Sequence, residues 1–415
     1  MDMLTAAKMA EKWGVSLRTV QNWCNQGKLP GAQRFGTSWM IPAQAERPRD
    51  RRSKAARYAA EEVFPPHRLL RKSPFLDMTD LYTEPGTADR CVQRLAEYPE
   101  EQALLAAEIA YSRGQIDDVY AQARIFLDSN SAFYAVIAGG MLLALVAMWE
   151  GDIHLWNEAH RHILEAPCHN DTDRDIVGLS LAATDSAIRD TDKFPEWFTR
   201  GRFSNLPRDA HPAAWVYYAK HLLLSAQDLA MGNVKLEGVS GISLLKIMPY
   251  IVEPMIATVA AEKIIMAEIY LRLLVAIAYR QHGDDLRAAE HLDKAILLCL
   301  PDRLYGPLVE HRRQLGPFLD DRLALIDPEA LRQVKLLHKK LHAGWTKLHN
   351  AVLDRHVQAA MTNREREVAR LTAYGLTDSQ IARQLHISES SVKAAIRTAK
   401  NKTGVNSRRE LTEFI

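Results

Sequence analysis

The last 55 residues, from Met361 to Ile415, constrain the fold of this chain most tightly. They repeat a pattern in which Ser or Thr is followed three residues later by Glu or Gln, and these side chains satisfy the free backbone donors at a helix start. The middle pair predicts a short helix over residues 378–385 and a second over about 388–402, with a turn at 386–387. This spacing is typical of a helix-turn-helix. The three pairs are Thr362 with Glu365, Thr377 with Gln380, and Ser407 with Glu410.

The second of these helices is basic, as a helix that enters a DNA groove must be. The segment resembles the C-terminal DNA-binding domain of LuxR-type regulators. The resemblance rests on 364–368 (RERE followed by Val), 375–377 (GLT), 381–382, Leu385, 387–388, 391–393 (SVK), 404–405 and 407–408. It implies that Lys393, Ala394 and Arg397 face the bases. Residues expected near the phosphates or at the helix start complete the predicted site: Ser388, Ser391, Lys400, Lys402 and Arg408.

Three positions depart from the LuxR-type pattern. Ala395 stands where the family often has His, which removes one possible DNA contact. Ala399 replaces a bulky aliphatic residue and Thr403 an apolar one, so both thin the packing of the second helix. These changes affect which DNA sequence the domain would prefer more than they affect its fold. The alternative is a small helical bundle that binds protein, which the basic residues on the second helix disfavour.

The first 45 residues predict a different DNA-binding domain. A helix over residues 6–13 ends at Gly14, Ser16 caps a second helix over 17–26, and Gly27 ends it. Val15, Val20 and Trp23 are expected to pack inward, because they share the apolar face of this helix. Residues 33–35 and 38–41 follow as a hairpin turned at Gly36 and Thr37.

This arrangement resembles the winged helix-turn-helix of MerR-type regulators and phage excisionases. The matching residues are 6–7, 15–16, 18–20 (RTV), Trp23, the 27–30 elbow (GKLP) and 34–42 (RFGTSWMIP). The resemblance implies that Arg18, Asn22 and Gln26 approach the major groove. Arg34 in the wing would touch the backbone or the minor groove. Ser16 and Thr19, at the start of the second helix, complete the predicted N-terminal site.

Charge is distributed unevenly along the chain. The whole chain has a net charge of +2, whereas residues 1–60 carry +7 and residues 355–415 carry +5, which leaves −10 for the middle. Attraction to phosphate is therefore concentrated at the two ends. The basic run over 47–54 follows the wing and is either a linker that lies along phosphates or a solvated tether.

The middle of the chain predicts an almost entirely helical body with tetratricopeptide-like pairs. Leu, Ala and Ile recur at helical spacing, and turns centre on Gly114, Gly151, Gly232 and Gly283. The chain is thus expected to be mainly α, an irregular α-solenoid flanked by two helix-turn-helix domains. Helix pairs are expected at 103–113 with 116–127, 133–149 with 153–164, and 266–281 with 285–300. The predicted domains are 1–46 (winged helix-turn-helix), 47–60 (linker), 61–355 (sensor or dimerisation body) and 356–415 (LuxR-type domain).

Several other classes of protein are disfavoured. Neither a phosphate-binding loop nor a catalytic signature stands out, so we expect no enzymatic activity and no cofactor. The uncharged stretch over 132–149 is just long enough to span a membrane, but a buried solenoid helix is the preferred interpretation. His338, His342, His349 and His356 are interpreted as a solvated helix face rather than a metal site.

These observations predict a cytoplasmic transcriptional regulator that binds double-stranded DNA. The four cysteines are widely spaced and the N-terminus begins directly with a helix-turn-helix, which favours a reducing, cytoplasmic setting. The helical body would make the chain a homodimer, sense a small-molecule effector or bind a partner, with RNA polymerase as a further expected partner. The alternative is a DNA-architectural or recombination-directing protein, suggested by the excisionase-like N-terminus. An enzyme hidden in the body is a third possibility that no constellation supports.

Overall fold

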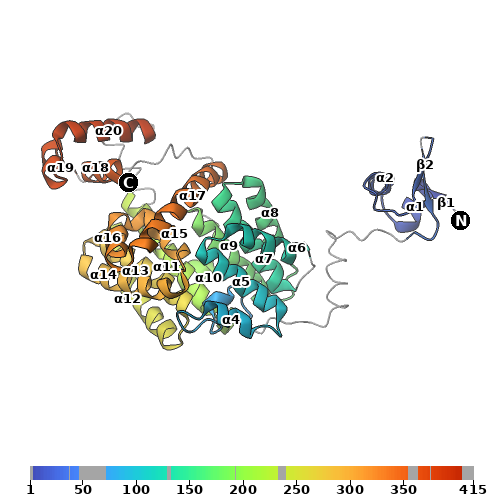
Figure 1. Cartoon of the computed structure of the whole chain (residues 1–415), viewed down its shortest axis with the longest axis horizontal. Coiled ribbons are helices and arrows are strands. Elements are labelled where there is room, and N and C mark those ends of the chain that lie inside the picture. The colour runs from blue at the N-terminus through green and yellow to red at the C-terminus, as the bar shows by residue number, and fades with distance from the viewer. Residues whose placement is uncertain are drawn as a thin grey trace. The chain divides into compact units, whose positions relative to one another are not determined.

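The computed structural model describes residues 3–36, 38–45, 72–128, 132–191, 193–231, 240–353, 363–373 and 375–403. The chain is mainly α-helical, as predicted. It divides into two compact units, Met1–Pro66 and His67–Ile415, and each is described by itself. Figure 1 shows the elements of both units with their labels. Residues 46–71 and the predicted turn at Gly232 lie outside the described part of the chain. The predicted pairs Thr362–Glu365 and Ser407–Glu410 each contain at least one residue that also lies outside it.

The N-terminal unit packs two helices on a small sheet. Its elements are β1 (Met3–Thr5), α1 (Ala6–Trp13), α2 (Leu17–Asn25), β2 (Gln33–Phe35) and β3 (Ser38–Pro42). The predicted helices and hairpin are all present. The antiparallel sheet has the order β1-β3-β2, so it contains a first strand that the sequence did not predict. Its core is formed by Ala6, Met9, Ala10, Val20, Cys24, Leu29 and Ile41.

The body of the second unit is built from helices that follow one another through short turns. The predicted pairs are confirmed as α5 with α6, α7 with α8, and α13 with α14. Gly114, Gly151 and Gly283 end α5, α7 and α13 in the left-handed conformation, as expected for helix C-caps. The helices are α4 (Ala88–Arg94), α5 (Pro99–Arg113), α6 (Ile116–Asp128), α7 (Phe133–Glu150), α8 (Ile153–Leu164), α9 (Asp171–Ala187), α10 (Glu196–Thr199), α11 (His211–Met231), α12 (Gly241–Ala261), α13 (Ile265–His282), α14 (Asp285–Cys299), α15 (Gly306–Leu315), α16 (Pro317–Ile326) and α17 (Pro328–Leu353), with short 3-10 turns η1 (Leu76–Met78), η2 (Arg208–Ala210) and η3 (Leu300–Asp302).

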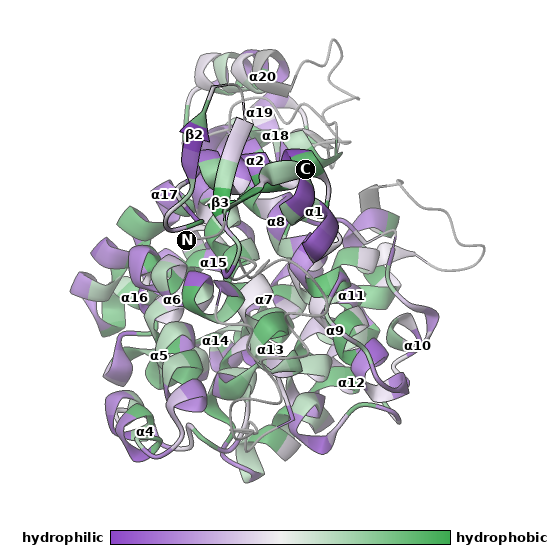
Figure 2. Ribbon diagram, turned by 90° about the vertical axis from the view of Figure 1, so that its right-hand side faces the viewer, coloured by the Kyte–Doolittle hydropathy of each residue, from purple (hydrophilic) through white to green (hydrophobic). Residues whose placement is uncertain are grey.

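Two helices lie at the centre of the body's single hydrophobic core. Helix α7 is apolar on all sides, and most of its residues are buried against its neighbours. Helix α13 is buried almost continuously from Ile265 to Tyr279, and Figure 2 shows it as a largely hydrophobic helix. Helices α7 and α12 are both long and apolar enough to cross a membrane, and 83% of an 18-residue stretch of α7 is buried, against 33% of such a stretch of α12. The burial of α7 supports the interpretation of residues 132–149 as a core helix.

The end of the body packs back on its beginning. Helix α17 lies against α7 and α8, α15 lies against α5, and η1 lies against α13. In a solenoid each repeat contacts only its neighbours. The tetratricopeptide-like repeat label is therefore not confirmed, although the helix pairs themselves are present. The closure is reinforced by the buried Asp302, whose carboxylate accepts hydrogen bonds from the Tyr82 hydroxyl and from the backbone of Gly86 and Ala88.

The histidine row on α17 does not form a solvated face. The rings of His338, His342, Trp345 and His349 stack in sequence along the helix. His349 is buried and its Nδ1 lies 2.7 Å from the carbonyl of Ile188. The interpretation was wrong because this face of α17 packs against the body. The fourth member, His356, lies outside the described residues.

In the C-terminal part of the second unit, the described residues 363–373 and 375–403 form three helices with a core of their own. It comprises α18 (Asn363–Ala373), α19 (Asp378–Gln384) and α20 (Glu389–Thr403). The predicted helix-turn-helix over residues 378–402 is confirmed as α19 and α20. Eight buried side chains form the core: Val368, Ala369, Leu371, Ile381, Ala382, Val392, Ile396 and Ala399.

Candidate nucleic-acid interface

Helix α2 presents a polar face to solvent while its other face holds the N-terminal core. Val20 and Cys24 are buried one turn apart, and Val15 and Trp23 pack partly against them. Arg18, Asn22 and Gln26 are exposed and recur every four residues, so they form one ridge. Arg18 and Asn22 lie on α2, the second helix of the helix-turn-helix and the position of a recognition helix, and Gln26 is its C-cap rather than part of the helix as predicted.

The start of α2 is fixed by side-chain capping. The Ser16 hydroxyl accepts a hydrogen bond from the Thr19 backbone N–H at 3.2 Å and lies 2.8 Å from the Thr19 hydroxyl. Ser16 and Thr19, both assigned to the predicted DNA site, are therefore also the residues that position the helix. An N-cap of this kind typically contributes about 1 kcal/mol.

The wing contributes a second exposed surface in the N-terminal unit. Arg34 lies in β2, opposite Trp39 of β3, and every residue of β2 is exposed. Phe35 beside it is 75% exposed, which is unusual for a large apolar side chain. Sequence reasoning did not single out Phe35, because an aromatic residue in a predicted strand is ordinarily assigned to a core. Its exposure next to Arg34 makes it a candidate contact residue.

The C-terminal helix-turn-helix is set by a capping box and a tight turn. The Thr377 hydroxyl accepts from the Gln380 backbone N–H, and the Gln380 side chain accepts in return from the Thr377 N–H at 2.8 Å. His386 has a positive φ of 51°, which reverses the chain between α19 and α20. Val392, Ile396 and Ala399 on the inner face of α20 are buried, and this fixes which face the helix turns outward.

The outer face of α20 gathers the predicted base-reading residues. Lys393, Ala394 and Arg397 are all exposed and share one side of the helix. Ser388 and Ser391 are exposed at its start, where the Ser388 hydroxyl accepts from the Ser391 N–H at 3.1 Å. Five of the eight predicted C-terminal residues are thus exposed on α20 or at its start.

The remaining predicted residues of this domain are placed differently. Lys400 is half-buried and already has interactions within the protein. Lys402 belongs to α20, and Arg408 lies outside the described residues. Ala395, where the pattern predicted a lost DNA contact, is half-buried and packs against the domain core. A residue at this position therefore contributes to packing within the domain. Ala399 is fully buried in the same core.

Charge favours phosphate at both surfaces. Among residues 3–45 the only acidic residue is Glu11, against Lys8, Lys12, Arg18, Lys28 and Arg34. Helix α20 carries four basic residues and one acidic residue, Glu389 at its first position. A positive surface raises the local concentration of a polyanion and speeds its association. The Cys24 thiol behind α2 is buried, and burial raises its pKa, so it stays protonated as part of the core.

Neither surface contains the elements of a metal centre. Within the described ranges, no group of three or more His, Cys, Asp or Glu side chains is placed to hold a metal ion. All four cysteines are free, with Cys24, Cys91 and Cys299 buried and Cys168 exposed. The chemistry that these two surfaces offer is therefore hydrogen bonding and charge attraction to a polyanion.

Comparison with known families agrees with both domains. Residues 359–415 match the family of bacterial regulatory proteins called the luxR family, and residues 3–45 match a helix-turn-helix domain family. Comparison with curated proteins and with solved structures finds no match. The two family matches support a DNA-binding regulator with a LuxR-type domain at the C-terminus and an excisionase-like helix-turn-helix at the N-terminus.

Proposed function

We propose that this protein is a sequence-specific transcriptional regulator whose two helix-turn-helix domains both read double-stranded DNA. The observation that carries the proposal is that each helix-turn-helix exposes a ridge with polar or charged side chains on its second helix or at the end of it. One ridge is Arg18, Asn22 and Gln26, and the other is Lys393, Ala394 and Arg397. Side chains of these types pair with base edges in the major groove, with Arg on guanine and Asn or Gln on adenine.

Selection of bound sequences from random duplex DNA, followed by affinity measurements, tests this proposal. Arg397→Ala is expected to weaken binding to a selected site by about 1–3 kcal/mol and to relax preference at one base position. Arg370→Ala is the matched control, because Arg370 is exposed on α18 of the same domain and carries the same charge. Equal losses in both variants would mean that α20 contributes charge alone and does not read bases.

The two domains are proposed to engage DNA in one complex. Tethering makes the second contact intramolecular, so the affinity of the whole chain can exceed that of either domain by about 10²–10⁴ when the geometry permits both. Binding through both domains also neutralises more phosphates. The logarithm of the binding constant should then fall more steeply with the logarithm of the salt concentration, by about 0.9 in slope for each additional phosphate. The competing possibility is that one domain binds RNA polymerase or another protein through its basic surface.

The body is proposed to make the chain a homodimer. Paired half-sites suit domains of this size, and the body is the part large enough for a stable interface. Helix α12 supports this idea, because Ile247 and Tyr250 lie one turn apart and are 53% and 69% exposed. Light scattering of the full chain tests it, with Ile247→Lys expected to give monomers and Lys339→Glu, at an exposed position on α17, as control. A monomeric wild type at micromolar concentration would contradict it.

Control of DNA binding is proposed to come from a small-molecule effector or a partner that acts on the body, without catalysis there. RNA polymerase is the proposed partner in transcription, and the proposed location is the cytoplasm or nucleoid, where the DNA is. The excisionase-like N-terminal domain also favours the alternative of a recombination-directing protein. In vitro transcription separates the two: a regulator changes transcript yield from a promoter that carries its site, whereas a recombination factor changes only the yield of recombined DNA.

A further inference from the structure

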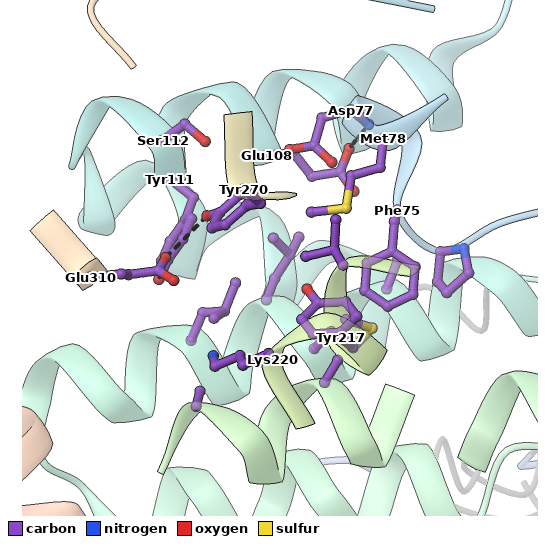
Figure 3. A pocket seen from close by; sticks show the side chains of 18 of the residues that line it. Phe75, Asp77, Met78, Glu108, Tyr111, Ser112, Tyr217, Lys220, Tyr270 and Glu310 are labelled. Atoms are coloured by element: carbon purple, nitrogen blue, oxygen red, sulfur yellow. Dashed lines mark hydrogen bonds between the residues drawn. The ribbon is translucent and has the colours of Figure 1, made fainter. Parts of the chain in front are cut away.

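The helical body contains a partly open cavity with a volume of about 70 Å³. Residues from η1, α5, α7, α9, α11, α13 and α15 line it, and Figure 3 shows that their side chains converge on a common space. A water molecule needs roughly 10–15 Å³ of such volume, so the cavity offers about five to seven positions of that size. Its contents are therefore limited to a small metabolite.

Two carboxyl groups lie together at one end of the cavity. Glu108 on α5 accepts hydrogen bonds from the backbone N–H groups of Leu76 and Asp77 at 2.9 and 2.8 Å. Asp77 and Glu108 are 7% and 8% exposed. Burial raises the pKa of Asp77 to about 7 and holds the pKa of Glu108 well above its ordinary value. The pair therefore retains protons near neutral pH, and a bound cation would let it ionise.

Lys220 on α11 faces the cavity away from this acid pair (Figure 3). Lys220 is half-buried, and to the part of the chain that the structure describes its ammonium makes neither a hydrogen bond nor an ion pair within 4 Å. Burial lowers the pKa of Lys220, and the charge of Glu310 only partly opposes this. An ammonium that has no hydrogen-bonded partner in this half-buried position would be stabilised by an anionic group in the cavity.

Tyr217 supplies a hydroxyl on the same side of the cavity as Lys220. The two residues are three positions apart on α11 and therefore share a face of the helix. The Tyr217 ring packs against Phe75, with ring centroids 5.3 Å apart, which orients it toward the cavity. Glu310 is already committed, because its Oε1 accepts from the hydroxyls of Tyr111 and Tyr270 at 2.9 and 3.1 Å.

The space between the two charged ends is apolar. Met141, Leu142 and Leu145 on α7 and Leu274 on α13 line it. A ligand that suits the cavity therefore has an anionic end, a cationic end and a short hydrocarbon part. The anionic end would lie at Lys220, and the cationic end would favour ionisation of the acid pair.

We propose that this cavity binds a small amino acid or an amino-acid-like zwitterion, with its carboxylate on Lys220 and Tyr217 and its ammonium on Asp77 and Glu108. The inference rests on the proposed function in one respect only, because the ligand would be the effector of the regulator. Since the lining residues come from helices distributed over the whole body, an occupied cavity would hold those helices in one arrangement. Binding can be measured without DNA, so the two proposals can fail separately.

The test uses the full-length protein in titration calorimetry and thermal melting. The probes are the twenty protein amino acids and the ω-amino acids from 3-aminopropanoate to 6-aminohexanoate. At least one is expected to bind with a stoichiometry of one per chain. For that probe, the analogue without the carboxylate and the analogue without the amine should each bind at least about tenfold more weakly, as expected when a hydrogen bond to a charged group is lost. Failure of every probe, or equal binding of a singly charged analogue, would overturn the proposal.

Two variants and a control locate the site. Lys220→Met should weaken the zwitterion by at least about tenfold and leave the amine analogue unchanged. Tyr217→Phe keeps the ring contact with Phe75 and should weaken the same probe to a smaller degree. Lys246→Met is the control, because Lys246 is exposed on α12 and does not line the cavity. Unchanged affinity in both cavity variants with a normal melting profile would overturn the assignment. If the protein binds DNA but binds none of the probes, the ligand-site proposal is refuted and the proposed regulatory function is not.

Discussion

Removing the Asp302 carboxylate tests how the body closes on itself. Asp302 is 6% exposed, and it accepts from the Tyr82 hydroxyl at 2.7 Å, from Gly86 N at 2.5 Å and from Ala88 N at 3.1 Å. Asp302→Ala leaves three donors without their acceptor. A buried unsatisfied donor costs about 1–3 kcal/mol, and the partly exposed Gly86 N–H can recover water. We therefore expect the free energy of unfolding of the body to fall by about 2–6 kcal/mol.

Urea unfolding of the full chain, followed by far-ultraviolet circular dichroism, measures this loss. Asp302→Asn keeps one carbonyl oxygen and should lose less than the alanine variant. Asp321→Ala is the control, since Asp321 is exposed on α16, and surface substitutions usually change stability by less than about 0.5 kcal/mol. A loss below about 1 kcal/mol for Asp302→Ala, with an unchanged urea slope, would refute the reasoning that this carboxylate joins the two ends of the body.

Three further results are expected. Gly344→Ala should destabilise the body by about 3 kcal/mol or more in urea unfolding, because a Cβ there would overlap the carbonyl of Trp149 where α17 crosses α7; a stable variant would mean that the helices can separate without cost. Asp77→Asn should gain stability relative to wild type as the pH rises from about 4 to about 7, because over this range Asp77 ionises in the unfolded chain while its pKa of about 7 keeps it protonated in the folded one; a constant difference between their melting temperatures would contradict this. Ile381→Ala removes a fully buried side chain from the C-terminal core at a cost of about 2–5 kcal/mol. It should abolish DNA contacts by that domain and leave the melting of the body unchanged, and joint melting of both would show that the domain has no core of its own.

Local signals made much of this structure predictable from the sequence. Glycines after the last helical residue marked the ends of α5, α7 and α13, because a left-handed C-cap needs no information from distant residues. The capping box of Thr377 and Gln380 likewise fixed the start of α19. The exposed ridges on α2 and α20 followed from the same periodicity, since a helix that buries one face must expose the other.

Contacts between distant residues were not predictable in the same way. Strand β1 is three residues long, and its pairing with β3 joins Met3 to Pro42 across the whole domain. The stacked histidines on α17 resembled a solvated row because their burial depends on helices far away in the sequence. The cavity has the same origin, because Asp77, Glu108 and Lys220 come together only after the body has closed.

Footprinting of the full-length protein on a selected DNA site tests most directly the claim that both domains read DNA together. The double variants Arg18→Ala/Asn22→Ala and Lys393→Ala/Arg397→Ala are compared with wild type at several salt concentrations. Each double variant is expected to lose a different part of the protected region, to bind more weakly, and to show a shallower salt dependence. A double variant that leaves the footprint, the affinity and the salt slope all unchanged would show that its domain does not contact DNA in the complex, and the two-domain account would be wrong.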